Sequence, residues 1–174
     1  MTGIILWLGG MFPVSVTGSI RLKLGAPPSD RTVKAVVDRI VDMLDAASAT
    51  EAWTENNQVR FKVSIFRLIW NWNILVPFNA GRFVVVPEDL SLVVRYSLSV
   101  LRMFLFVTLI LAALLVFFFW QSTDRMEALR TDLPGLGLAW LWLFGVNYLI
   151  TMIRMPLWLR RGLRRDPELK RQRA

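Results

Sequence analysis

Two long stretches without a charged side chain, residues 103–123 and 133–153, constrain this chain more than any other feature. Each stretch holds 21 residues and is mostly apolar. An α-helix needs about 20 such residues to cross the hydrocarbon core of a bilayer. A lipid-exposed backbone must satisfy its polar groups within its own segment, so both stretches are predicted to be membrane-spanning α-helices.

The two predicted spans divide the chain into a domain, a hairpin and a tail. About 100 residues precede the first span, which is enough for one small domain with a single core. The predicted parts are a cytoplasmic α+β domain at 1–100, a transmembrane helical hairpin at 101–158 with spans at about 101–121 and 134–156 and an outer loop at 122–133, and a basic juxtamembrane tail at 159–174.

The formal net charge of +8 is concentrated after the second span. Residues 154–174 hold eight basic and two acidic side chains, whereas residues 121–135 hold two basic and three acidic ones. Lys and Arg collect on the cytoplasmic side of membrane spans, so the domain and the tail of this multi-pass protein are predicted to be cytoplasmic. A polybasic segment beside a membrane attracts anionic headgroups, and membrane lipids are therefore predicted partners.

The start of the chain is predicted to form two strands. Residues 1–20 carry no charge, but they lack the basic start and the cleavage site of a signal peptide. Glycines and a proline within 9–13 also interrupt any helix long enough to span a bilayer. We expect one strand at 3–8 and a second from Val14, where apolar and polar side chains alternate as far as Leu24.

An amphipathic helix is predicted after these strands. Ser29 or Asp30 can cap its N-terminus. Apolar residues then recur every three or four positions, as they do on a helix that lies on a sheet. These apolar residues are Val33, Val36, Val37, Ile40, Val41, Leu44 and Ala47.

Further strands complete the predicted domain. Alternation marks a strand at 59–65, and β-branched residues mark another at 82–86. Residues 91–100 also alternate, but Pro87 makes a good helix start, so strand and helix both stay open there and propensity favours the strand. The fold class is therefore α+β, a small N-terminal mixed sheet with one amphipathic helix, followed by the transmembrane hairpin and the basic tail.

The apolar stretch at 65–78 allows two interpretations. As a core strand it would end near Pro77, and this interpretation is favoured because large exposed apolar patches are rare in monomers. As a surface it would rest on the bilayer or on a partner through Trp70, Trp72 and Phe78, because amphipathic aromatic side chains favour interfaces.

Side chains in and after the second span are further interface candidates. Trp140 and Trp142 point to different faces of this span. Asn147 lies near its middle, where an amide needs a partner, and we expect a hydrogen bond to Thr108 across the hairpin. The candidates beyond the span, at the inner membrane surface, are Trp158, Arg160, Arg161, Arg164 and Arg165.

The lack of cysteine and histidine excludes several kinds of chemistry. No disulfide or thiolate can form. The commonest ligand for zinc, copper and haem is missing, as is the commonest general base near neutral pH. Phosphate-binding loops, dinucleotide fingerprints and metal-ligand spacings are absent too. We therefore expect no catalytic residue, cofactor or metal site, and no nucleic-acid partner.

These features favour a non-catalytic accessory subunit that stabilises a larger bacterial membrane complex. Its partners would be other membrane-protein subunits, and an energy-transducing assembly, photosynthetic or respiratory, would be a natural host. The alternative is a freestanding membrane-anchored binding module that recognises lipid or a cytoplasmic partner through the surface at 70–78.

Overall fold

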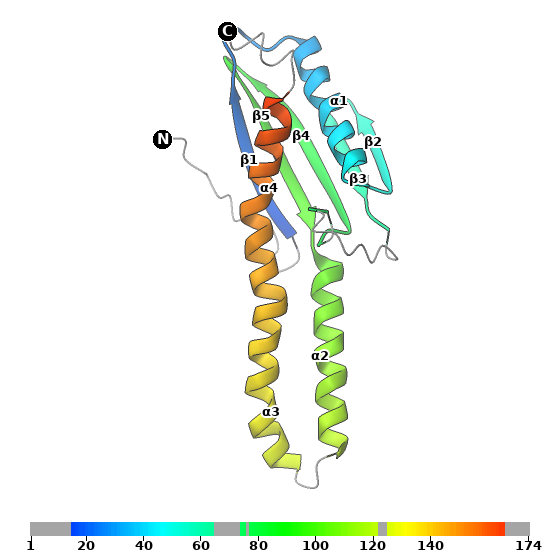
Figure 1. Ribbon diagram of the computed structural model, residues 1–174. Coiled ribbons are helices and arrows are strands. Elements are labelled where there is room, and N and C mark those ends of the chain that lie inside the picture. The colour runs from blue at the N-terminus through cyan, green and yellow to red at the C-terminus, as the bar shows by residue number, and fades with distance from the viewer. Residues whose placement is uncertain (1–14, 65–73, 76, 122–124, 166–174) are drawn as a thin grey trace.

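The computed structural model describes residues 15–64, 74–75, 77–121 and 125–165. These residues form a five-stranded sheet with helices on one face and a helical hairpin that extends from one end (Figure 1). The strands are β1 (Ser15–Lys23), β2 (Glu51–Glu55), β3 (Gln58–Lys62), β4 (Ala80–Glu88) and β5 (Ser91–Ser99). The helices are α1 (Asp30–Ala46), α2 (Leu101–Gln121), α3 (Arg125–Trp140), the π-helical segment η1 (Leu141–Val146) and α4 (Asn147–Arg164).

The sheet has the strand order β1-β5-β4-β3-β2, and the predicted α+β class is confirmed. The sequence predicts a mixed sheet, whereas all described neighbours pair antiparallel. Short turns join β2 to β3 and β4 to β5, and such turns can connect only antiparallel strands. The ambiguous segment at 91–100 is a strand, β5, which lies between β1 and β4. The strand predicted at 3–8 lies outside the described residues.

The alternation of apolar and polar side chains along β1 explains which side of the sheet is buried. Val16, Ile20 and Leu22 are at most 3% exposed, while the polar side chains between them face the open side. Helix α1 covers the buried side with its predicted apolar stripe. The Ser29 side chain caps this helix by accepting a hydrogen bond from the Thr32 backbone N–H, 3.3 Å away.

Part of the stretch at 65–78 belongs to the core of this domain. Leu75 and Phe78 are at most 1% exposed, which agrees with the core interpretation at these two positions. Phe78 is therefore corrected from an interface candidate to a core residue, because its side chain is fully buried within the hydrophobic core. Trp70 and Trp72 lie outside the described residues.

Two helices in the described part of the chain are long and apolar enough to cross a membrane. One is α2, and the other runs from α3 through η1 into α4 (Figure 1). They meet near the sheet, where the rings of Phe104, Trp140 and Phe144 have centroids 5.0–6.0 Å apart. Aromatic pairs at these distances add stability beyond their buried area, so this cluster holds the two long helices together.

The boundaries of the second long helix differ from those of the predicted second span, outer loop and tail. Helix α3 already begins at Arg125, inside the segment predicted as an outer loop. At its other end α4 continues beyond the hairpin and lies on the sheet beside α1 (Figure 1). Met155, Leu159 and Leu163 are fully buried there, so the first part of the predicted tail is instead part of the domain core.

A hydrogen bond across the hairpin exists, but its donor is not Asn147. The indole Nε1 of Trp140 donates to the Thr108 hydroxyl oxygen, 3.1 Å away. Asn147 is exposed, and its side-chain amide donates to the Leu143 carbonyl oxygen within its own helix at 2.6 Å. The expected bond between Asn147 and Thr108 is wrong, because the backbone four residues earlier satisfies the amide locally.

Candidate binding groove between α1 and α4

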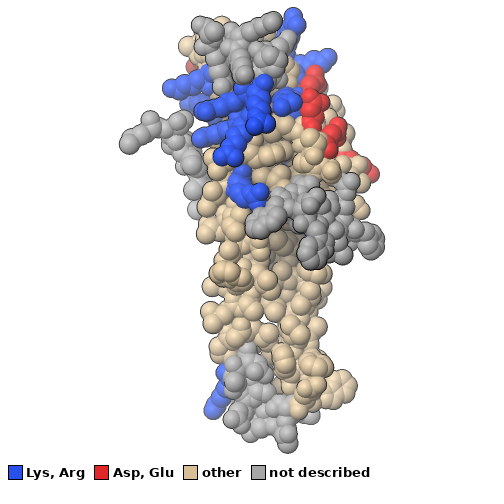
Figure 2. Space-filling view, in the orientation of Figure 1, with Lys and Arg blue, Asp and Glu red and all other residues tan. Residues whose placement is uncertain are grey.

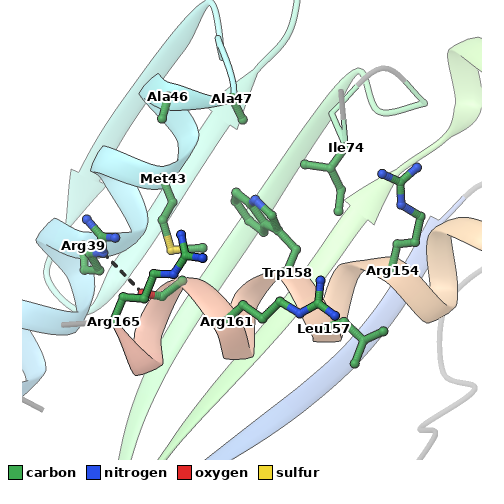
Figure 3. A pocket seen from close by; sticks show the side chains of 11 residues that line it. Arg39, Met43, Ala46, Ala47, Ile74, Arg154, Leu157, Trp158, Arg161 and Arg165 are labelled. Carbon is green, nitrogen blue, oxygen red and sulfur yellow. Dashed lines mark hydrogen bonds between the residues drawn. The ribbon is translucent and has the colours of Figure 1, made fainter. Parts of the chain in front are cut away.

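A groove of about 690 Å³ runs between α1 and α4 on the helical side of the domain. We call it the arginine groove. Its walls come from the two helices, and Ile74 of the β3–β4 connection closes one side (Figure 3). The lining residues are Arg39, Met43, Ala46, Ala47, Ile74, Arg154, Leu157, Trp158, Arg161, Gly162 and Arg165.

Gly162 sets the distance between the two helices. The Arg39 Nε donates to the Gly162 carbonyl oxygen at 3.4 Å, close to the long limit for a hydrogen bond. A Cβ atom at position 162 would overlap the end of the Met43 side chain. Glycine therefore allows α1 to approach α4 closely at the groove.

Trp158 supplies the largest apolar surface inside the groove. Its indole lies between Met43 of α1 and Ile74, with the arginine side chains on both sides along α4 (Figure 3). The ring is half-buried and packs against the domain core. The groove thus combines an apolar floor with a basic border.

All charged side chains in the described lining of the groove are basic. Four of the lining residues are arginines, and none is acidic. Figure 2 shows Lys and Arg side chains in a band over the domain, with acidic side chains gathered to one side of the band and few charged side chains along the hairpin below it. A guanidinium presents a rigid fork of donors that suits phosphate and carboxylate oxygens, so the groove favours an anionic group.

The predicted site residues are distributed over three places. Trp158, Arg161 and Arg165 line the groove, while Arg160 and Arg164 belong to α4 without lining it. Trp140 and Asn147 lie in the hairpin with the partners described above. Trp142 also lies in the hairpin, where it is 70% exposed.

Sequence reasoning missed four groove residues that matter: Arg39, Met43, Arg154 and Gly162. The first two lie on α1, more than 100 residues before α4, so no local pattern connects them to it. For Arg154 and Gly162, the spacing of residues along α4 contains a signal. Arg154, Trp158 and Gly162 recur every four residues and so share one helix face.

The opposite, open face of the sheet is a second basic surface, but its charges are mixed. Arg21 forms an ion pair with Glu88 at 2.7 Å, and Arg60 lies 3.6 Å from Glu55. The Lys62 ammonium lies over the ring of Trp53, 5.6 Å from its centroid. Exposed pairs of this kind contribute little energy, and we interpret this face as a solvated surface.

The core of the domain includes a titratable side chain, Tyr96. Burial raises the pKa of Tyr96 to about 12, against a smaller opposing effect of the Arg160 guanidinium. The phenol therefore stays protonated at neutral pH. No group of three or more acidic side chains that could hold a metal ion occurs among the described residues.

Comparison with known proteins does not place this chain in a family. No family model, curated protein or solved structure matches it.

Proposed function

We propose that this protein is a non-catalytic accessory subunit of a larger membrane complex, inserted through the hairpin as a multi-pass protein. The observation that carries the proposal is the continuous helix from Arg125 to Arg164, which belongs to both the hairpin and the domain core. This helix gives the domain a fixed height and orientation relative to the hairpin. Such rigidity suits a subunit with fixed neighbours, whereas a module that searches for partners is better served by a flexible linker.

The outer surface of the hairpin supports the same proposal. Phe106, Leu109 and Trp142 are 63–70% exposed, so this surface needs lipid or other helices as its surroundings. A Cβ atom added at Gly135 or Gly137 would meet nothing within 4 Å. Glycines that open outward allow another membrane helix to approach closely, which favours a neighbouring subunit.

The charge pattern supports a cytoplasmic domain. Both ends of the hairpin meet at the sheet (Figure 1), and Arg154, Arg160 and Arg161 follow the apolar stretch on that side. The positive-inside rule then puts the domain and the end of the chain in the cytoplasm. Membrane lipids with anionic headgroups would contact this basic end.

Cysteine labelling tests the orientation, since the natural chain has no cysteine. Single variants Lys23→Cys, Arg165→Cys and Gln121→Cys would be treated with an impermeant maleimide on intact cells. We expect label on Gln121→Cys alone, and on all three variants after the cells are permeabilised. Label on Lys23→Cys in intact cells would contradict the proposed orientation.

Affinity purification in a mild detergent tests the subunit proposal. We expect the tagged protein to migrate with a large complex in a fixed ratio, and mass spectrometry would identify the other subunits. Gly137→Phe should release the protein from the complex, whereas Leu138→Phe, at an already large and 68% exposed side chain, should not. Elution of the natural chain alone in every mild detergent would overturn the proposal.

The arginine groove favours a second candidate, a freestanding membrane-anchored module that recognises lipid. In that case the protein would elute alone but with bound lipid. The same purification therefore separates the two candidates.

A further inference from the structure

Exposed side chains at a spacing of four residues along α4 change from apolar to basic. Leu149, Ile153 and Leu157 are spaced four residues apart and are 45–58% exposed. Arg161 and Arg165 continue the same spacing at the groove. Residues four apart are neighbours on a helix, and each step of four turns about 40° around the axis, so this apolar row winds from the hairpin toward the groove arginines.

We propose that the arginine groove binds one anionic phospholipid. Its phosphate would lie between Arg154 and Arg161, and an acyl chain would follow the apolar row of Leu149, Ile153 and Leu157. The inference shares only the membrane placement with the proposed subunit role, and it specifies the binding site that the second candidate would use. It assigns a defined binding site for one lipid, in place of a general attraction between the basic end of the chain and the membrane.

The height of the arginines above the membrane agrees with this site. Arg154 directly follows the uncharged stretch that ends at residue 153. Arg161 is seven residues further along α4, which is roughly 10 Å along a helix axis. The headgroup layer of a bilayer is about 5–8 Å thick on each side. A phosphate at that level can contact both arginines without leaving the membrane surface.

The apolar parts of the groove favour a lipid over a small soluble anion. Trp158, Met43 and Ile74 form an apolar floor beside the arginines (Figure 3). A free phosphate would gain nothing from this floor or from the apolar row. A phospholipid can use both, because its glycerol and acyl carbons would cover them and leave the phosphate with the guanidinium groups.

Native mass spectrometry of the full chain tests the site. The protein would be purified in mild detergent and mixed with equal amounts of phosphatidylglycerol and phosphatidylcholine that carry the same acyl chains. We expect one phosphatidylglycerol per chain to be retained in preference. Each basic side chain near a membrane surface contributes about fivefold to headgroup affinity, so Arg161→Gln with Arg165→Gln should weaken retention roughly 30-fold.

Two further variants make the test specific. Lys23→Gln with Arg95→Gln removes the same charge from the open face of the sheet and should leave retention unchanged. Ile153→Gln with Leu157→Gln keeps the arginines and should weaken retention about fivefold or more, because the acyl chain loses its apolar contacts. If the double arginine variant does not fold, the Ile153→Gln, Leu157→Gln variant still tests the lipid site.

Several outcomes would overturn the inference. These are equal retention of the two lipids, an equal loss in the open-face control, and displacement of the lipid by excess glycerol phosphate, which would indicate a soluble ligand. An alkaline wash separates this inference from the proposed function. Release of the chain from membranes contradicts both, whereas a chain that stays inserted without a lipid preference contradicts the lipid site alone.

Discussion

The phenol oxygen of Tyr148 lies 3.0 Å from the carbonyl oxygen of Ser15 and donates a hydrogen bond to it. This bond joins the first turn of α4 to the first residue of β1, 133 positions apart in the chain. It is the point where the long second helix leaves the hairpin and meets the edge strand of the sheet.

Tyr148→Phe should weaken this connection. Loss of the donor leaves the ring in place and should lower the free energy of unfolding by about 1 kcal/mol. Unfolding in detergent micelles would measure the change, and amide exchange near Ser15 should become faster. An unchanged exchange rate at β1 would show that the bond does not hold the strand.

Leu159→Ala should destabilise the domain strongly. Its side chain is fully buried on the sheet, and truncation of a buried leucine costs about 2–5 kcal/mol. Leu138→Ala, at a side chain that is 68% exposed on the hairpin, should change the unfolding free energy by less than about 0.5 kcal/mol. Equal effects of the two variants would mean that α4 does not pack on the sheet.

A double-mutant cycle of Trp140→Phe and Thr108→Val should show that these two residues are coupled. Hydrogen bonds between membrane helices contribute about 0.6 kcal/mol on average, and we expect a coupling energy of that size. A second cycle with Asn147→Ala and Thr108→Val should give no coupling, because the Asn147 amide bonds within its own helix. Coupling in the second cycle alone would restore the pairing that the sequence suggested.

Gly18→Ala should disturb the contact between β1 and β5. Gly18 lies opposite Tyr96, and an added Cβ atom would overlap the phenol ring. The ring is confined in the core, so overpacking should lower the unfolding free energy by about 1–3 kcal/mol. Gly137→Ala is the control, since its Cβ would meet nothing within 4 Å and alanine favours a helix.

The stability of the domain should fall above pH 10 because of Tyr96. Burial raises the pKa of this phenol to about 12, so the unfolded chain, with a pKa near 10, loses the proton first. The contribution of Tyr96 to the free energy of unfolding is fully present below pH 10 and is lost between pH 10 and 12, by about 3 kcal/mol in total. Denaturant unfolding of the natural chain and of Tyr96→Phe should diverge in this interval, and parallel curves would contradict the assignment.

The strands and α1 could be predicted from the sequence because the burial of their side chains repeats every two to four residues. Val16, Ile20 and Leu22 alternate with polar residues on β1, and the stripe from Val33 to Leu44 follows one face of α1. Both patterns arise because one side of the element meets the core and the other meets water.

The role of α4 could not be predicted in the same way. Met155 and Leu159 are apolar in a lipid-facing span and in a domain core alike, so composition alone cannot separate the two. The groove was equally hidden, since Arg39 and Arg161 come together only when α1 and α4 lie on the same face of the sheet. A partial signal was available, because arginines interrupt the apolar pattern of this helix from residue 154 onward.

Helix α4 follows all five strands of the sheet and α1 in the chain, and this order matters for biosynthesis. All five strands and α1 leave the ribosome before the second long helix does. The half of the sheet beside β1 therefore keeps an uncovered apolar face until Met155, Leu159 and Leu163 have been made. Under the proposed insertion, nascent chains whose second long helix does not cross the bilayer would keep this surface exposed to chaperones and proteases. Folding of the domain would then depend on insertion of the hairpin.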